Sequence, residues 1–295
     1  MGEFLAVVAA FLFAFGTVLQ QKGTMETTAG EGDPNFLLQI LHKPIWLMGA
    51  ICQATGWVVQ AVALDKAALV VVQSLTALSL VIALPLGIWL THQRIGRREI
   101  LGASLTLIGI IFFLSAGAPS GGNSEGSATA WWTACLVIGF LVVTLAFVGN
   151  RMSASAKALT LGAAAGLGYG LQAAVTKTFV TLVGQGIVTL LTSWTIYVLV
   201  ISAVSGFVLQ QSALKTGVLA PAMASSNSVT LFASVILGIA VYGEKLSASG
   251  SGHVASAYVG LAVAIVGIAL LAGSEGPPEE ATTQAPDTPD LSPAQ

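Results

Sequence analysis

Charged residues are scarce in this sequence: Lys, Arg, Asp and Glu together make up 8% of 295 residues, against 55% for apolar residues. The mean hydropathy is +0.86. So few polar side chains cannot solvate the surface of a globular domain of this length. The composition therefore excludes a soluble globular fold, and most of the apolar surface is expected to face lipid.

Cysteine and histidine are also scarce, and their positions indicate no metal or redox site. Cys52 and Cys135 lie inside apolar runs, where a free cysteine acts as a small packing residue. The three histidines have no ligand spacing; they are His42, His92 and His253. We therefore expect no metal centre and no cofactor.

Catalytic side chains are missing from the apolar segments, which contain no His and no Asp. An intramembrane enzyme needs convergent acid, base or nucleophile residues. The GLGYG run at 166–170 follows no strand, so it does not fit a dinucleotide loop, and close helix packing explains it better. We expect no enzymatic activity and no nucleic-acid partner, while the glycine run would also suit a homodimer interface.

The few acids are concentrated at the C-terminal end of the chain. Residues 274–295 are rich in Pro, Thr and Glu and contain no Lys or Arg. Their five acids are Glu275, Glu279, Glu280, Asp287 and Asp290. This segment has little to bury, so we predict a disordered acidic tail.

Long apolar runs dominate the rest of the sequence. A helix needs about 20 predominantly apolar residues to cross the hydrocarbon core. Asp65 and Lys66 divide one long run into two spans joined by a tight hairpin, since an undivided helix would exceed the bilayer. About nine spans result, near 2–21, 44–64, 67–90, 99–117, 130–149, 156–180, 189–210, 216–242 and 254–273.

The distribution of Lys and Arg between the loops predicts the orientation of these spans. Eight basic residues lie on the side of the odd-numbered loops and three on the other side. Basic residues favour the cytoplasmic side. We therefore expect a multi-pass protein of the cell membrane with its N-terminus outside and its C-terminus in the cytoplasm.

Motifs of the first half of the chain recur in the second half. ATGWVVQAVALDKAALV at 54–70 aligns with VSGFVLQQSALKTGVLA at 204–220, and LGIWLTHQRI at 86–95 aligns with LGIAVYGEKL at 237–246. Equivalent residues include Gly56 and Gly206, Gln60 and Gln210, Gly102 and Gly260, Gly109 and Gly267, and Lys22 and Lys177. Such self-similarity predicts an internal structural repeat.

The two repeats are predicted to be inverted. Five spans separate their starts, and five is odd, so the second copy enters the membrane from the opposite side. The expected fold is all-α, with two inverted four-helix repeats at 1–117 and 153–273, a linking helix and external loop at 118–152, and the tail at 274–295. Inverted repeats are typical of transporters, with the substrate site near the midplane at their interface.

Each predicted repeat closes on a short turn, such as GEKL at 243–246, before a final helix with Gly-x6-Gly spacing. With this pattern the chain resembles the drug/metabolite transporter superfamily and its EamA-like domains. VLQQKGT at 18–24, KPIWLMGA at 43–50 and the nine-span count are most similar to the NIPA-type, magnesium-transporter-like branch. The resemblance implies membrane transport, although Trp57 stands where that branch typically has an acidic residue.

Polar side chains inside the predicted spans are the candidate substrate-binding residues, because burying them in lipid is costly. Hydrogen bonding between helices is the alternative for the amides and hydroxyls. Extension to the headgroups is the alternative for the two lysines, which end the first and sixth spans. The candidates are Gln60, Gln73, Thr76, Gln172, Gln210, Ser226, Asn227, Thr230, Lys22 and Lys177.

Three hypotheses for the function follow. The first is a secondary transporter that moves a small solute or ion by alternating access between the repeats. The second is a transporter of Mg²⁺ or another divalent cation, which rests on the resemblance. We rank it second because Trp57 stands where that branch typically has an acid, and a hard cation prefers charged oxygen ligands. The third is a lipid-handling membrane scaffold.

Overall fold

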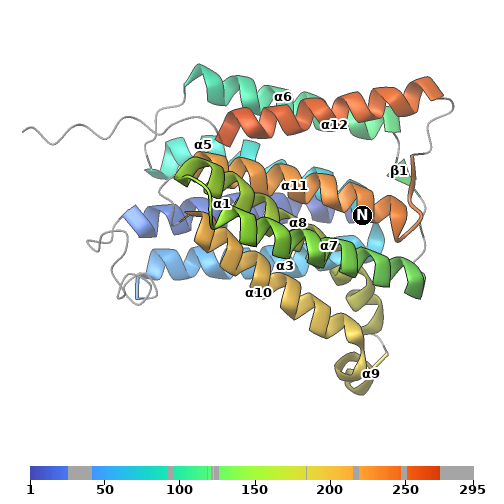
Figure 1. Ribbon diagram of the computed structural model, residues 1–295. Helices are drawn as coiled ribbons and strands as arrows, with labels where there is room; N and C mark the ends of the chain where they lie inside the picture. The colour runs from blue at the N-terminus through green and yellow to red at the C-terminus, as the bar shows by residue number, and fades with distance from the viewer. Residues whose placement is uncertain are drawn as a thin grey trace, which may run out of the picture.

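The computed structural model describes residues 1–25, 42–91, 96–117, 119–120, 122, 126–183, 185–214, 219–246 and 251–272. These residues form a bundle of helices that lie alongside one another (Figure 1). The predicted acidic tail and most of the predicted Gly/Ser-rich loop fall outside the described residues. The prediction of a helical fold is confirmed.

The helices and the two short strands have the following bounds. In chain order they are α1 (Gly2–Met25), α3 (Pro44–Lys66), α4 (Leu69–Thr76), α5 (Ser79–Thr91), α6 (Arg97–Gly117), β1 (Pro119–Ser120), α7 (Ala128–Gly149), α8 (Ala154–Val183), α9 (Ile187–Thr192), α10 (Trp194–Leu214), α11 (Leu219–Ala240), β2 (Lys245–Leu246) and α12 (Ser251–Ala272).

Within the described residues, six helical segments are long and apolar enough to cross a membrane. They are Gly2–Gln20, Pro44–Lys66, Leu69–Leu90, Ile100–Gly117, Ala128–Gly149 and Ala156–Val183. Three shorter apolar helices, Trp194–Gln210, Ser225–Ala240 and Val254–Leu270, fall in the remaining predicted spans. The chain is a helical membrane protein, while the count of nine spans and their inverted arrangement stay predictions.

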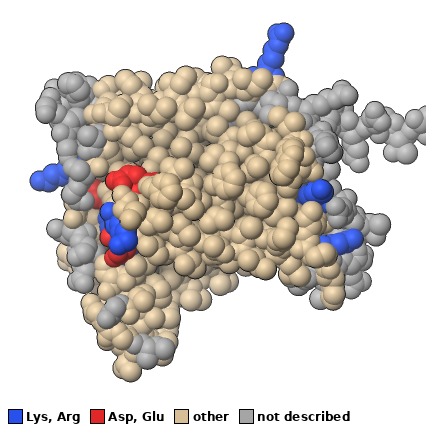
Figure 2. All heavy atoms as spheres, turned by 180° about the vertical axis from the view of Figure 1, so that it is seen from behind, with Lys and Arg blue, Asp and Glu red and all other residues tan. Residues whose placement is uncertain are grey.

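The surface of the bundle fits a lipid environment. Large apolar side chains point outward, most of all on α7, where Trp132 and Phe140 are about seven-tenths exposed (70% and 71%). In Figure 2 Lys and Arg lie toward the two ends of the molecule and the middle is almost free of charge. An apolar belt between charged ends is what a bilayer requires.

The helices pack in distinct pairs. α1 packs along α3, α8 packs against both α10 and α11, and α6 packs along α12. The α6–α12 contact is close because glycines face backbone there: a Cβ at Gly109 would lie 2.7 Å from the Gly260 carbonyl oxygen, and one at Gly267 would lie 2.7 Å from that of Gly102. Small residues at such crossings are typical of membrane helix pairs.

One end of the bundle is tied together by contacts between distant segments. β1 pairs antiparallel with β2, with Pro119 opposite Leu246 and Ser120 opposite Lys245. The N-terminus lies at the same end (Figure 1), where Gly2 packs against Ala67 after α3. We call this the N-terminal end of the bundle. The predicted orientation makes it the outer end.

Candidate functional site

A buried ion pair lies at the N-terminal end of the bundle. The Lys177 Nζ of α8 donates to the Glu244 Oε1 at 2.6 Å, and the two side chains are only 10% and 1% exposed. Taking charges out of water is costly, so buried charges persist only with partners. Of the ion pairs between described residues, this is the one with both side chains buried.

The Glu244 carboxylate also caps α4. It accepts hydrogen bonds from the backbone N–H groups of Leu69 at 2.6 Å and Val70 at 2.9 Å, the first two residues of that helix. These N–H groups have no partner within a helix, and the helix dipole adds positive potential there. The carboxylate is therefore held by a cation and by a helix N-terminus together.

The turn after α11 positions this carboxylate. Gly243 has φ of +64°, a left-handed conformation that glycine adopts at little cost. The Glu244 N–H then bonds back to the Gly238 carbonyl at 3.0 Å. On the other side, a Cβ at Gly122 would lie 2.7 Å from the Glu244 Cγ. Glycines on both sides thus let the chain close around the acid.

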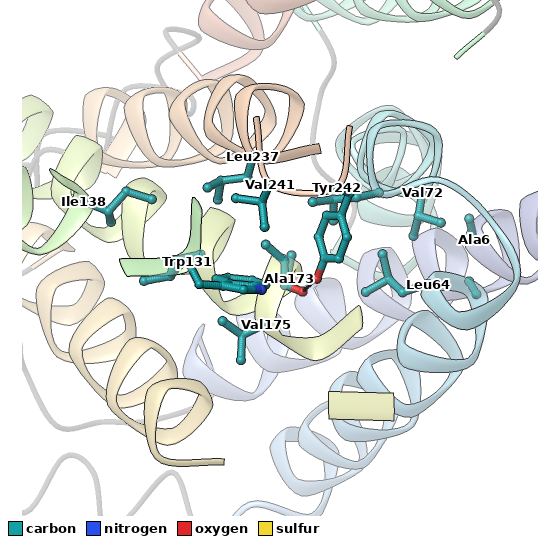
Figure 3. Close-up of a cluster of buried hydrophobic side chains, with 14 residues drawn as sticks. Ala6, Leu64, Val72, Trp131, Ile138, Ala173, Val175, Leu237, Val241 and Tyr242 are labelled. Atoms are coloured by element: carbon teal, nitrogen blue, oxygen red, sulfur yellow. Dashed lines mark hydrogen bonds between the residues drawn. The ribbon is translucent and has the colours of Figure 1, made fainter. Parts of the chain in front are cut away.

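Aromatic side chains cover the ion pair. The Lys177 Nζ lies 4.6 Å from the centre of the Tyr242 ring, a cation–π contact. The Tyr242 hydroxyl donates to the Ala174 carbonyl and lies 2.8 Å from the Thr178 hydroxyl. Trp131 of α7 meets the Tyr242 ring edge-on at 5.9 Å, and Figure 3 shows both side chains pointing into the same apolar cluster. We call Lys177, Glu244, Tyr242, Thr178 and Trp131 the ion-pair cluster.

The third predicted span is broken near its middle. α4 ends at Thr76 and α5 begins at Ser79, although the segment Leu69–Leu90 is apolar throughout. At the break, the N–H groups of Leu78 and Leu80 bond to carbonyls three residues earlier, at 3.1 Å and 3.3 Å, in place of the α-helical pattern. Discontinuous helices are common where transporters bind their substrates.

Gln73 lies one turn before this break. Its side chain is 95% buried, being 5% exposed. Its Nε2, which carries two donors, has no hydrogen-bond partner among the described residues. A buried donor without a partner costs about 1–3 kcal/mol. Such a group is a candidate for contact with a ligand.

α11 packs against α4 at the level of the break. A Cβ at Gly238 would touch Val70, and just after the end of α4 Ala77 packs on the cluster that contains Leu231. The antiparallel helices therefore bring Thr230 of α11 level with the break. Its hydroxyl lies 2.8 Å from the Ser226 carbonyl and 3.2 Å from that of Gly166, in α8.

Four of the predicted residues lie on two helices that pack against each other. Gln73 and Thr76 belong to α4, Ser226 and Thr230 belong to α11, and all but Thr230 are buried. We call these four the midplane group. Asn227 is half-buried on the same stretch of α11.

The other predicted residues are distributed over separate helices. Gln60 on α3 and Gln172 on α8 are half-buried, whereas Gln210 on α10 is buried. Lys22 is half-buried in the last turn of α1, at the C-terminal end of that helix. The interpretation of Lys177 as a helix-terminal residue reaching the headgroups is wrong, because it is buried before the end of α8 and paired.

Glu244 is the residue that the sequence analysis missed. In the sequence it is one residue of the GEKL turn that closes the second predicted repeat. In the aligned motifs Gln93 is the residue equivalent to Glu244. The one available signal for Glu244 in the sequence is therefore that its charge occurs in one predicted repeat and not in the other. Its partner Lys177 is 67 residues away in sequence, and no local pattern joins the two.

Metal-binding geometry is not found in the described part of the chain. No group of three or more His, Cys, Asp or Glu residues occurs there that could hold an ion. Trp57, at the position where the magnesium-transporter-like branch typically has an acid, is 52% exposed on α3. The described polar interior therefore consists of amides, hydroxyls and one neutralised ion pair.

Fold and site together define a polytopic helical membrane protein with a buried polar interior. No family model matches the chain, and no solved structure matches it. An uncharacterized protein of Corynebacterium glutamicum is 31% identical over 245 residues, which cover 81% of this chain and 84% of that relative. The chain belongs to the same family as this corynebacterial protein.

Proposed function

We propose that the chain is a secondary transporter of the drug/metabolite type, which moves a small solute or ion by alternating access between two inverted repeats. The observation that carries this proposal is the broken third span. The Gln73 Nε2, which is buried and has no partner among the described residues, lies one turn before this break, on the helix that packs against α11. A structural scaffold has no need for an unmet donor there.

The helix contacts support the inverted arrangement. In the proposed repeats α1 corresponds to α8, α3 to α10, the α4–α5 span to α11, and α6 to α12. The α1–α3 contact then matches α8–α10, and the contacts of α1 with α4 and α5 match α8–α11. α6 and α12 pack on each other, as equivalent helices beside a two-fold axis do.

The glycine crossings support the same symmetry. Gly102 is equivalent to Gly260, and Gly109 to Gly267. The contacts join Gly102 to Gly267 and Gly109 to Gly260, so exchanging the repeats turns one contact into the other. A two-fold axis through the α6–α12 crossing requires this exchange.

A second matched contact involves an aromatic ring in each repeat. A Cβ at Gly56 would lie 2.8 Å from the Phe13 ring, and one at Gly206 would lie 3.0 Å from the Tyr169 ring. Gly56 and Gly206 are the equivalent glycines of α3 and α10. In both proposed repeats an aromatic ring thus packs on the equivalent glycine.

Alternating access needs a polar site that opens to one side at a time. The midplane group supplies amide and hydroxyl groups at the α4–α11 contact, and the ion-pair cluster closes the N-terminal end above it. We place this end outside the cell membrane on the Lys/Arg distribution of the loops. The conformation described is then closed to the outside.

A ligand screen followed by a flux measurement tests this function. Thermal unfolding of the purified protein would be followed with amino acids, sugars, nucleosides, organic acids and divalent cations. The solutes that stabilise it would then be tested for uptake into proteoliposomes. Gln73→Ala is expected to abolish both effects, and Gln185→Ala, at an exposed amide, is the control. A solute that stabilises and enters equally well with Gln73→Ala would contradict the assigned site.

Divalent-cation transport is the second candidate, and the observation in its favour is the layout shared with the magnesium-transporter-like branch. Uptake of Mg²⁺ into proteoliposomes that persists without any proton gradient would distinguish this function from solute transport. The exposed Trp57 and the described interior without clustered carboxylates favour an uncharged or organic solute.

A further inference from the structure

We infer that Glu244 is a proton-binding site, and that proton uptake at this carboxylate drives opening of the N-terminal end of the bundle. The inference rests on the proposed function, because it names the ion to which alternating access is coupled. It concerns a residue outside the midplane group.

Three separate parts of the fold converge on the Glu244 carboxylate. Lys177 comes from α8, the acid itself from the turn after α11, and the Leu69 and Val70 N–H groups from the start of α4. α4 belongs to the first proposed repeat, and α8 and the turn belong to the second. Any movement that parts the repeats at this end removes hydrogen-bond donors from the carboxylate.

The carboxylate holds this end closed only while it is charged. Bonds of an ionised acid to a lysine and to helix N–H groups are charge-assisted, and protonation of the acid abolishes that assistance. Conversely, parting the repeats takes the two helix N–H donors away from the carboxylate, and an acid with fewer donors binds a proton more readily. Proton binding and the closed end therefore oppose each other.

The sign of the coupling follows from linkage. If opening favours the protonated acid, then protons favour opening by the same factor. Acidification on the side that this end faces should shift the population toward the open conformation, and alkaline conditions should shift it toward the closed one. In the proposed orientation this makes the external proton the coupling ion.

The neighbouring ionisable groups that the structure describes do not compete for this role. Asp65 and Lys66, after which α4 begins, pair with each other at 3.9 Å and are 42% and 46% exposed. The N-terminal ammonium pairs with Glu3 at 3.2 Å, at 83% and 63% exposure. Lys245 is exposed on β2, and the Tyr242 hydroxyl is already hydrogen-bonded.

A metal ion fits this position less well than a proton. Glu244 supplies one carboxylate, and Lys177 already neutralises it at 2.6 Å. The described residues add no second acid within a metal-binding group. A hard cation would need several oxygen ligands, whereas a proton needs one.

Cysteine accessibility tests the inference without a known substrate. Ser234→Cys would be introduced into a background of Cys52→Ala and Cys135→Ala, since Ser234 is fully buried on α11 between the ion-pair cluster and the midplane group. A membrane-impermeant maleimide would be applied to intact cells. Ala128→Cys, exposed at the start of α7, corrects for the chemical pH dependence of thiol labelling.

The corrected labelling rate of Ser234→Cys is expected to be several-fold higher at about pH 5 than at about pH 8, because carboxylic acids begin to take up protons toward the lower value and protonation removes the bonds that hold this end closed. Adding Glu244→Gln, which is neutral at every pH, should give fast labelling at both values. A rate that does not change with pH, or a pH response that persists with Glu244→Gln, would overturn the inference.

A second variant covers the case in which Glu244→Gln does not fold. Lys177→Met leaves the acid without its cation and should move the midpoint of the labelling curve to higher pH. An unchanged midpoint would also overturn the inference. If labelling follows pH but no solute is transported, the proposed function fails and the proton site stands; if solute is transported while labelling ignores pH, only the proton site fails.

Discussion

At the scale of single residues, the charges inside this protein are few and mutually dependent. Lys177 and Glu244 neutralise each other, while the Gln73 amide lacks a described partner for its nitrogen. Sequence reasoning identified Lys177 and Gln73, because polar groups in apolar helices stand out. It could not identify Glu244, since a residue in a polar turn reveals its burial only once distant helices are packed.

Replacing one partner of the Lys177–Glu244 ion pair should destabilise the protein more than replacing both. Lys177→Met or Glu244→Leu alone leaves one buried charge unpaired and is expected to lower the free energy of unfolding by about 3–5 kcal/mol. The double variant should lose less than either single variant. Denaturant titration in detergent measures all three, with Asp65→Asn at the exposed pair as a control near zero. Losses that simply add would show that the two side chains do not interact.

Gln73 should behave as a binding residue and contribute little to folding. Replacing it by Leu removes a buried donor that has no described partner, so the free energy of unfolding should be unchanged or raised by up to about 1–3 kcal/mol. Stabilisation by added solute should disappear in the same variant. A loss of several kcal/mol in denaturant titration would mean instead that the amide is bonded within the protein.

At the scale of elements, hydropathy located the helices well because bilayer thickness fixes how long an apolar helix must be. It missed the break between α4 and α5. Ala77 and Leu78 are good helix formers, and no Gly or Pro marks the position, so local propensity predicts a continuous helix. α4 is stabilised as a separate short helix by its packing on α11 and by the N-terminal cap from Glu244.

The α6–α12 pair should depend on its glycines. Gly267→Ala would place a Cβ 2.4 Å from the backbone nitrogen of Thr106, and we expect it to lower the melting temperature clearly, as overpacking costs about 1–3 kcal/mol. Gly139→Ala on α7 is the matched control, because nothing lies within 4 Å of that Cβ. Its higher helix propensity should leave stability equal or slightly raised. Equal effects of both changes would argue against a close α6–α12 crossing.

At the scale of the whole molecule, composition alone predicted a membrane protein. The proposed repeat rests on aligned motifs such as Gly102-x6-Gly109 and Gly260-x6-Gly267. The aligned motifs do not indicate which helices of the two proposed repeats touch each other, because an alignment carries no distances. The structure adds the antiparallel crossing of these glycines. The cargo of the proposed transporter depends on side-chain geometry, which architecture alone does not determine.

The proposed orientation makes a prediction for the two ends of the chain. A cysteine placed before α1 should react with an impermeant maleimide in intact cells, and one placed after α12 should react only after the cells are lysed. The reason is the excess of basic residues on the side of the odd-numbered loops. Labelling of both ends from the same side would contradict an odd number of spans and hence the inversion.

Counterflow in proteoliposomes tests alternating access most directly. Vesicles would be loaded with the unlabelled solute that most stabilises the protein, then diluted into a trace of the same solute in labelled form. A carrier that alternates between two sides should accumulate the label transiently above its equilibrium level, and Gln73→Ala should abolish this accumulation while Gln185→Ala retains it. Simple equilibration of the label without overshoot, or no entry of any stabilising solute, would contradict the account.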